Sequence, residues 1–187
     1  MKKKLKLKSL HFAVGALVIG AFLPIFIKND YYMMVLNRVL INIIVVLGLN
    51  FITGLTGQMN LGTAGIFALG AYSSALFTRY TNLTPWLGLI AAVIMGILIG
   101  RGLGYPSLRV RGVYLSLTTI GFGEVVRLLI SNTPKFTGGT QGIRNIRPYN
   151  IGSYQIQSQK EMYYLFLVFT AIAFFIAWRI AYSKWGR

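Results

Sequence analysis

Polar side chains with the charge and reach for chemistry gather on one apolar stretch in the second half of the chain. Ser116, Thr119 and Arg127 are spaced by three and eight residues, which puts them on one face of a helix, and Glu124 adjoins that face. A carboxylate and a guanidinium three residues apart can pair, and pairing lowers the cost of charge inside a membrane. We expect a structural Glu124–Arg127 pair or a polar path for a solute, with this face turned into a helix bundle.

A second candidate is the glycine-rich stretch 54–65, which separates two apolar runs. Gln58 and Asn60 lie between Gly57 and Gly62, where irregular backbone would expose N–H and C=O groups that lipid cannot satisfy. Such backbone occurs at membrane depth where it is buried in protein or lines a cavity, as in the broken helices of transporters. The stretch predicts either a broken or re-entrant segment or an ordinary turn between two spans. The candidate pathway residues are Gln58, Asn60, Ser116, Thr119 and Glu124.

The composition indicates what kind of elements must position these residues. Apolar residues make up 55% of the 187 residues and charged residues only 12%, against about 25% in soluble domains. The 19 Lys and Arg residues exceed the 3 acidic ones, but they lie in short clusters between apolar runs. That arrangement is typical of basic loops beside membrane lipid and argues against a nucleic-acid partner. We expect an all-α integral membrane protein.

Six apolar runs are each close to the length that spans a bilayer. They are 10–27, 33–52, 61–78, 86–103, 112–130 and 162–180. They predict one polytopic transmembrane helical bundle over 1–187, with about six spans and the possible break near 54–65. The first run is longer than the apolar core of a signal peptide, so we expect it to stay as a helix. On the second run Arg38, Asn42 and Asn50 form a polar arc, serving either helix packing or a solute path.

Basic residues predict the orientation, because cytoplasmic loops carry the excess of Lys and Arg. With the N-terminus inside, eleven of these residues fall on the cytoplasmic side and six outside. Both termini are then cytoplasmic in a multi-pass protein of a bacterial or archaeal-type cell (inner) membrane. The longest polar stretch, 131–160, becomes an external loop that is either a docking surface or a solvated linker.

Residue types that are missing exclude several functions. The chain has no cysteine, one histidine and three acids, so we expect no disulfide, no metal site and no cofactor. It also lacks the P-loop motif for hydrolysing ATP. A membrane-embedded enzyme using Glu124 as general base stays open, although a base needs a nucleophile or metal nearby. A channel also stays open, although it would need rings of carbonyls or charges from a symmetric oligomer.

Several ordered motifs resemble one transporter family. The first block has Leu47-Gly48-Leu49-Asn50, Gly57-Gln58-x-Asn60-Leu61-Gly62 and Phe67-x-x-Gly70-Ala71-Tyr72. The second has Leu108-Arg109-Val110-Arg111-Gly112-Val113-Tyr114-Leu115, Thr118-x-x-Gly121-Phe122-Gly123-Glu124-x-x-Arg127-Leu128 and Thr137-Gly138-Gly139-x-x-Gly142-Ile143. They resemble the permease subunits of branched-chain amino acid ABC importers, and the second block looks like the LivM-type subunit.

The resemblance implies a non-enzymatic subunit forming half of the membrane path for branched-chain amino acids, or for urea or short amides in a variant. It implies three kinds of partner: a second LivH-like permease, two cytoplasmic ATPases and an external solute-binding protein. The apolar runs add membrane lipid. Thr63 departs from the family, which often has histidine there. Ser183-Lys184-x-Gly186-Arg187 resembles the start of a cytoplasmic segment that continues in the family. We therefore expect a fragment, a truncated and nonfunctional permease, or a permease whose remaining half is a separate chain.

Overall fold

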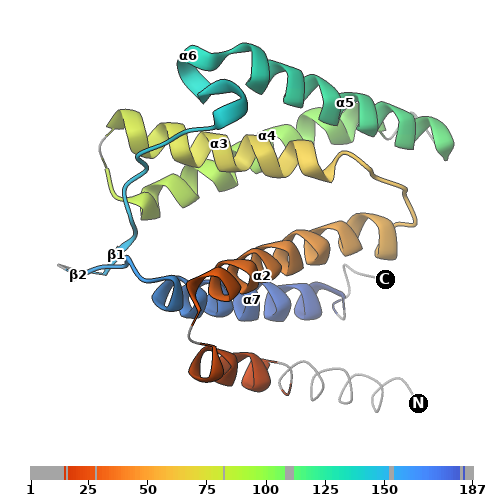
Figure 1. Cartoon of the computed structure of the whole chain (residues 1–187). Helices are drawn as coiled ribbons and strands as arrows, with labels where there is room; N and C mark the ends of the chain where they lie inside the picture. Colours follow the sequence, from red (N-terminus) through yellow and green to blue (C-terminus); the bar gives the residue numbers. More distant parts are fainter. Residues whose placement is uncertain are drawn as a thin grey trace, which may run out of the picture. The chain divides into compact units, whose positions relative to one another are not determined.

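The computed structural model describes residues 15, 17–27, 29–81, 83–107, 112–151, 154–181 and 183. The chain divides into two compact units, one formed by 1–48 with 157–187 and the other by 49–156 (Figure 1). Part of the predicted first span, residues 10–14 and 16, lies outside the described residues. The rest of that run forms an apolar helix at Leu17–Phe26.

The first unit contains α2 (Asp30–Asn50) and α7 (Gln159–Ala181), and both helices start with capping residues. At α2 the side-chain oxygen of Asn29 accepts the Tyr31 N–H at 2.9 Å, and Asp30 places a negative charge in the first turn. At α7, Ser158 and Glu161 have the spacing of a capping box, and Glu161 Oε2 accepts the Ser158 N–H at 3.4 Å. These local signals fix where each helix begins.

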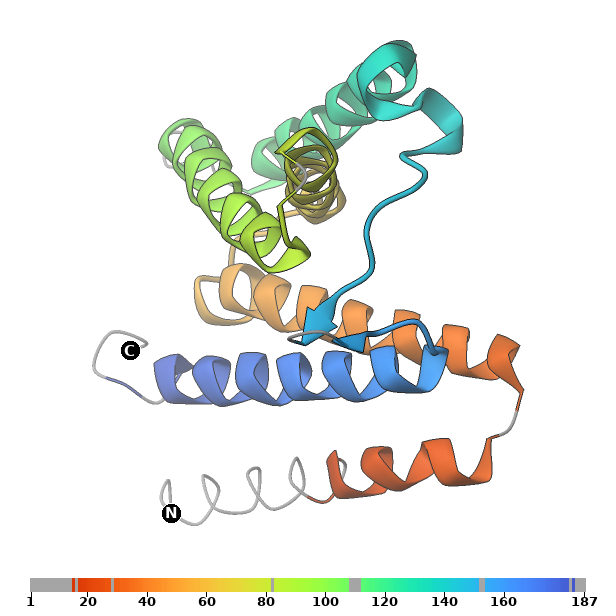
Figure 2. The same ribbon diagram turned by 90° about the vertical axis from the view of Figure 1, so that its left-hand side faces the viewer.

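Packing in the first unit joins α2 and α7 through Met33, Leu40 and Tyr163, which form its buried apolar core. Asn37 Nδ2 donates to Gln159 Oε1 at 3.0 Å, near the start of α7. Figures 1 and 2 show α2 and α7 side by side and running in the same direction, with the helix Leu17–Phe26 running oppositely along α7. The predicted polar arc on α2 is exposed within this chain, and Asn37 is the polar residue of α2 that is buried.

The second unit is built from η1 (Phe51–Leu55), α3 (Thr63–Thr81), α4 (Pro85–Ser107) and α5 (Val113–Asn132). Figure 2 shows α4 and α5 on different sides of α3. Helices α3 and α4 approach closely at Gly88, where an added Cβ would lie 2.6 Å from Thr78 Oγ1 and 2.7 Å from Ser74 Oγ. A small residue at the crossing is the usual way for two membrane helices to pack.

Residues after α5 fold into short elements. They are α6 (Pro134–Thr137), the 3₁₀ turn η2 (Gly139–Gln141) and an antiparallel pair, β1 (Asn150–Ile151) with β2 (Tyr154–Gln155). Trp86 at the start of α4 anchors this hairpin, because its Nε1–H donates to Asn150 O at 2.7 Å and its ring meets Tyr149 edge-on. The predicted loop 131–160 is thus locally ordered where the structure describes it, and its two ends belong to α5 and α7.

Four helices of the described chain are long and apolar enough to cross a membrane: Asp30–Gly54, Pro85–Tyr105, Val113–Asn132 and Gln159–Ala181. The predicted class, a helical membrane protein with several spans, is confirmed. The predicted number of six is not. The helix Leu17–Phe26 is shorter than a span, and α3 has 19 residues but carries hydroxyl groups and Arg79 that lower its apolar character.

Candidate functional site

The candidate site begins where α2 loses its regular hydrogen bonding. The helix widens into the π turn η1, in which the Asn50 side chain lies over Gly54 so closely that any Cβ on Gly54 would overlap its amide oxygen. Gly57 follows with φ 68°, a conformation that favours glycine. Irregular backbone occurs within the predicted stretch 54–65 and is limited to 56–62, which fits both predicted alternatives, a broken segment and a turn between two helices.

Two hydroxyl groups of α5 satisfy the backbone of this irregular segment. Thr119 Oγ1 accepts the Leu61 N–H at 3.1 Å and donates to Ser116 O at 2.9 Å. Ser116 Oγ donates to Met59 O at 3.3 Å. Ser116 and Thr119 are only 9% and 6% exposed, so the contacts replace water at backbone groups that lipid would leave unpaired.

Glycines allow the segment to lie directly on α5. A Cβ on Gly62 would be 2.6 Å from the carbonyl oxygen of Thr119, and one on Gly65 would be 3.1 Å from the Cα of Gly123. Gly62 also caps α3, because its carbonyl accepts the Gly65 N–H at 3.0 Å, and its own N–H reaches Asn60 Oδ1 at 2.8 Å. The start of α3 is therefore fixed against α5 by backbone contact.

The predicted pathway residues thus have different surroundings. Ser116 and Thr119 hold the segment 56–62, and Asn60 closes a turn within it. The half-buried side chain of Gln58 has no hydrogen-bond partner among the described residues. The structure places four of the five candidates at one site, and Gln58 is the one whose side-chain amide oxygen and nitrogen both lack a partner among the described residues.

The fifth candidate, Glu124, lies farther along α5 in a two-pronged pair with Arg127. Arg127 Nε donates to Glu124 Oε2 at 2.8 Å and Nη2 donates to Oε1 at 2.5 Å. The side chains of Glu124 and Arg127 are 51% and 63% exposed, so this part of the polar face does not look into the unit, contrary to expectation. Helix α3 still covers α5 at Gly123, where Gly65 approaches closely, but Glu124 lies about 100° around the helix from Gly123 and so points away from α3. An exposed ion pair on an apolar helix requires cover by another protein or water.

Other polar groups add little chemistry to the site. No three His, Cys, Asp or Glu side chains come together to hold a metal ion within the part of the chain that the structure describes. The hydroxyl of Thr63, at the first residue of α3, is buried and has no hydrogen-bond partner in the described part.

Comparisons with known proteins identify a family and relatives that this chain is similar to in sequence. The family described as the permease component of branched-chain amino acid transport systems matches residues 31–187. The high-affinity branched-chain amino acid transport system permease protein LivM of Escherichia coli K12 is 41% identical over 135 residues, covering 72% of this chain and 32% of that protein. LivM of Salmonella typhimurium LT2 is 40% identical over the same shares. The chain spans about a third of the length of these relatives. No solved structure matches.

Proposed function

The chain belongs to the family of permease components of branched-chain amino acid transport systems, and on that premise we propose that it serves as a membrane-spanning subunit of an ATP-binding cassette importer. It would form half of the path for leucine, isoleucine, valine or a related solute. The observation that carries the proposal is the family match over 31–187, which includes all four span-length helices and the segment 56–62.

The geometry suggests how the candidate residues divide the work. Ser116, Thr119 and Asn60 act as positioning residues that hold irregular backbone in place, as transporters do where a broken helix meets its solute. Gln58 is the contact residue in this proposal, because its amide has both donors and an acceptor to offer to the polar ends of an amino acid.

Helix directions support six crossings. Because α2 and α7 run the same way, the chain must cross the bilayer an odd number of times between them. Helices α4 and α5 supply two crossings, so α3 would supply the third, and it lies alongside both. The helix Leu17–Phe26 runs opposite to α7 and would belong to one further span, the first in chain order, which makes six. With the excess of basic residues inside, both termini are cytoplasmic and 131–160 is external.

The remaining partners follow from the family and from exposed groups of α5. We propose a second LivH-like permease, two cytoplasmic ATPases that hydrolyse the ATP, and an external solute-binding protein. Val113, Tyr114 and Leu117 are each at least 67% exposed on α5, and the Glu124–Arg127 pair is exposed as well. A second membrane subunit would cover this helix better than lipid alone, since lipid cannot solvate the ion pair.

Uptake measurements test the transport function. Deleting the gene in its own host should abolish high-affinity uptake of radiolabelled leucine, isoleucine or valine, and the wild-type chain should restore it. In the deletion strain the Gln58→Ala variant should accumulate to the wild-type protein level but show a raised KM for uptake. Gln155→Ala, at an exposed glutamine of β2, should behave as wild type. Labelled urea serves as the comparison solute. Unchanged uptake of all of these solutes in the deletion strain would refute the proposal.

Single cysteines test the orientation, because the chain has none of its own. Ser158→Cys, at the predicted external loop, should react with a membrane-impermeant maleimide in intact cells. Arg101→Cys, near the C-terminal end of α4 on the proposed cytoplasmic side, should react only after the membrane is permeabilised. The reverse pattern would contradict cytoplasmic termini.

The alternative of a membrane-embedded enzyme has no observation in its favour. The carboxylate of Glu124 accepts two hydrogen bonds from Arg127, whereas a general base must lie within hydrogen-bond reach of the group that it deprotonates.

A further inference from the structure

A pocket rich in positive charge lies at the C-terminal ends of α3 and α5 and is independent of the site described above. It is open and has a volume of about 470 Å³. Its lining residues, which we call the cationic pocket, are Arg79, Pro134, Lys135, Gly138, Gln141, Gly142, Arg144 and Asn145. Three cations from three separate segments therefore line one concave surface.

The shape of the cationic pocket depends on special backbone conformations. Gly138 and Gly142 have φ 73° and 70°, and a Cβ on Gly138 would overlap the carbonyl oxygen of Gly142. Asn145 also has positive φ, at 59°. Arg144 Nη2 donates to Gln141 Oε1 at 2.9 Å, which fixes one nitrogen of the guanidinium and leaves its other donors available.

Nothing in the unit 49–156 neutralises these cations. Its single acidic residue is Glu124, and Arg127 already occupies both carboxylate oxygens. No acid lines the cationic pocket. A basic residue near a helix C-terminus complements the helix dipole, which accounts for Arg79 on α3, but not for the convergence of Lys135 and Arg144 on the same hollow. Like charges held together in this way call for an anion from outside the chain.

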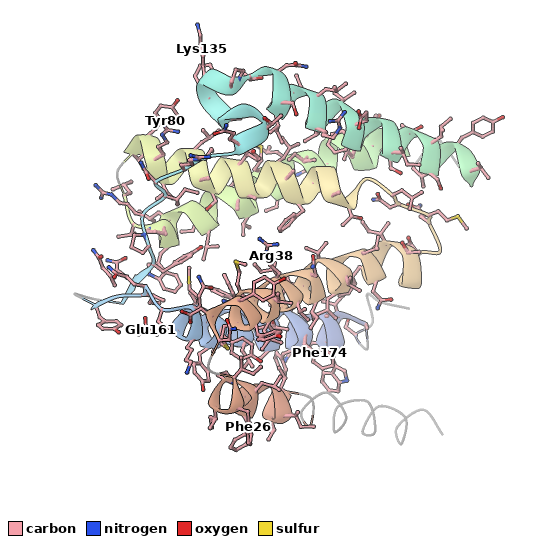
Figure 3. The ribbon with its side chains drawn as sticks, in the orientation of Figure 1. Phe26, Arg38, Tyr80, Lys135, Glu161 and Phe174 are labelled. Atoms are coloured by element: carbon pink, nitrogen blue, oxygen red, sulfur yellow. The ribbon has the colours of Figure 1, made fainter. Side chains whose placement is uncertain are left out.

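The location indicates which anion is at hand. Lys135 follows the span-length helix α5 by three residues, so the pocket lies at the membrane boundary. Tyr80 and Phe136, beside Arg79 and Lys135 in the sequence, are 62% and 56% exposed. Figure 3 shows Tyr80 and Lys135 at the same end of this unit. Exposed aromatic rings with Lys and Arg at the end of a span are typical of the level of the lipid headgroups.

We propose that the cationic pocket binds the phosphate group of an anionic phospholipid. The donors of Arg79 and Arg144 would pair with the phosphodiester oxygens, Lys135 would add a point charge, and the aromatic rings would lie among the headgroups. This inference goes beyond transport and requires only that α5 spans the membrane.

The test measures lipid retained by the purified full chain, by native mass spectrometry from neutral detergent with added phosphatidylglycerol or phosphatidylcholine. Wild type should prefer phosphatidylglycerol. Arg79→Gln with Arg144→Gln should weaken it about 100-fold, at about tenfold for each charge-assisted contact. Arg147→Gln, which removes one charge from the same segment outside the pocket, should weaken it no more than about fivefold, less than the roughly tenfold expected for a single pocket arginine. Circular dichroism should show unchanged helix content in all variants.

Each outcome bears on the lipid proposal. No preference for phosphatidylglycerol in wild type, or equal losses in both variants, would overturn it. Binding of orthophosphate with the same variant dependence, but without lipid binding, would show that a free anion occupies the pocket and would overturn the lipid source. If the double variant keeps its lipid preference and instead loses protein partners, the pocket binds an acidic protein surface and the proposal is wrong.

Discussion

Replacing Gly62 by serine tests the contact between the irregular segment and α5 with a predicted sign. Serine is at least as good as glycine at a helix N-cap, so capping alone would leave α3 unchanged or slightly more stable. The new Cβ, however, would lie 2.6 Å from the carbonyl oxygen of Thr119, where ordinary contact begins near 3.4 Å. The segment must therefore move by about 0.8 Å.

That movement has a calculable cost. It would stretch the Leu61 N–H to Thr119 Oγ1 bond from 3.1 Å to about 3.9 Å, beyond hydrogen-bond distance. Interhelical hydrogen bonds in membranes are worth about 0.6–1.7 kcal/mol, and overpacking costs about 1–3 kcal/mol. We expect Gly62→Ser to lower the free energy of unfolding by about 2 kcal/mol, roughly a 30-fold change in the folded-to-unfolded ratio.

Unfolding of the purified chain by SDS in mixed micelles, followed by the helical signal in circular dichroism, measures this change. Gly70→Ser is the matched control, because Gly70 lies within α3 and has nothing within 4 Å of an added Cβ. The control should be neutral or stabilising by about 0.5 kcal/mol. A Gly62→Ser variant as stable as wild type would refute the close approach of this segment to α5.

Three further changes give predictions of known sign. Gly88→Ala should destabilise the protein by about 1–3 kcal/mol because its Cβ would meet a threonine hydroxyl of α3 at 2.6 Å. Gly96→Ala on the same helix has open space and should stabilise by up to about 1 kcal/mol. Equal shifts of the two variants in the SDS assay would contradict the close crossing of α3 and α4. Thr119→Val should lower the free energy of unfolding by about 0.6–1.7 kcal/mol more than Thr118→Val, because the exposed hydroxyl of Thr118 bonds only within its own helix. Equal losses in the SDS assay would count against the contact between Thr119 and the irregular segment. Burial raises the pKa of Tyr149 above its ordinary 10.0. The neutral form therefore contributes stability that is complete below about pH 10 and is lost as pH rises through the raised pKa. Tyr149→Phe should reduce that loss in alkaline unfolding curves, and curves identical to those of the wild type would exclude this contribution of Tyr149.

Much of the helical framework is legible in the sequence. The predicted runs 33–52, 86–103 and 162–180 lie within helices of span length, and 112–130 begins one residue before such a helix, because apolar runs and their polar boundaries are local properties. The irregular backbone at 56–62 is legible for the same reason, since glycines cluster between apolar runs. The α6 turn also had a signal, with Pro134 at its first position and Gly138 after its end.

The contacts across the fold were not legible. Ser116 and Thr119 are recognisable as polar residues of a membrane helix, but their partners Met59 and Leu61 use backbone groups that every residue has. The sequence does not distinguish Asn37 from the polar arc on α2, because the burial of Asn37 depends on where α7 packs. The cations of the pocket lie up to 65 residues apart, and only the turns at Gly138 and Gly142 bring them together.

The bond between Leu61 and Thr119 sets an order of events during synthesis, because 58 residues separate the two. At about 5–20 residues per second, the hydroxyl reaches the membrane about 3–12 seconds after the backbone it must satisfy. During that interval the start of α3 has no partner on α5, so in the proposed α3 span lipid would leave its amides unpaired. On the proposed topology the nascent chain would wait in a watery or proteinaceous environment until α5 arrives, so that the helix made last of the three completes the hairpin of α3 and α4.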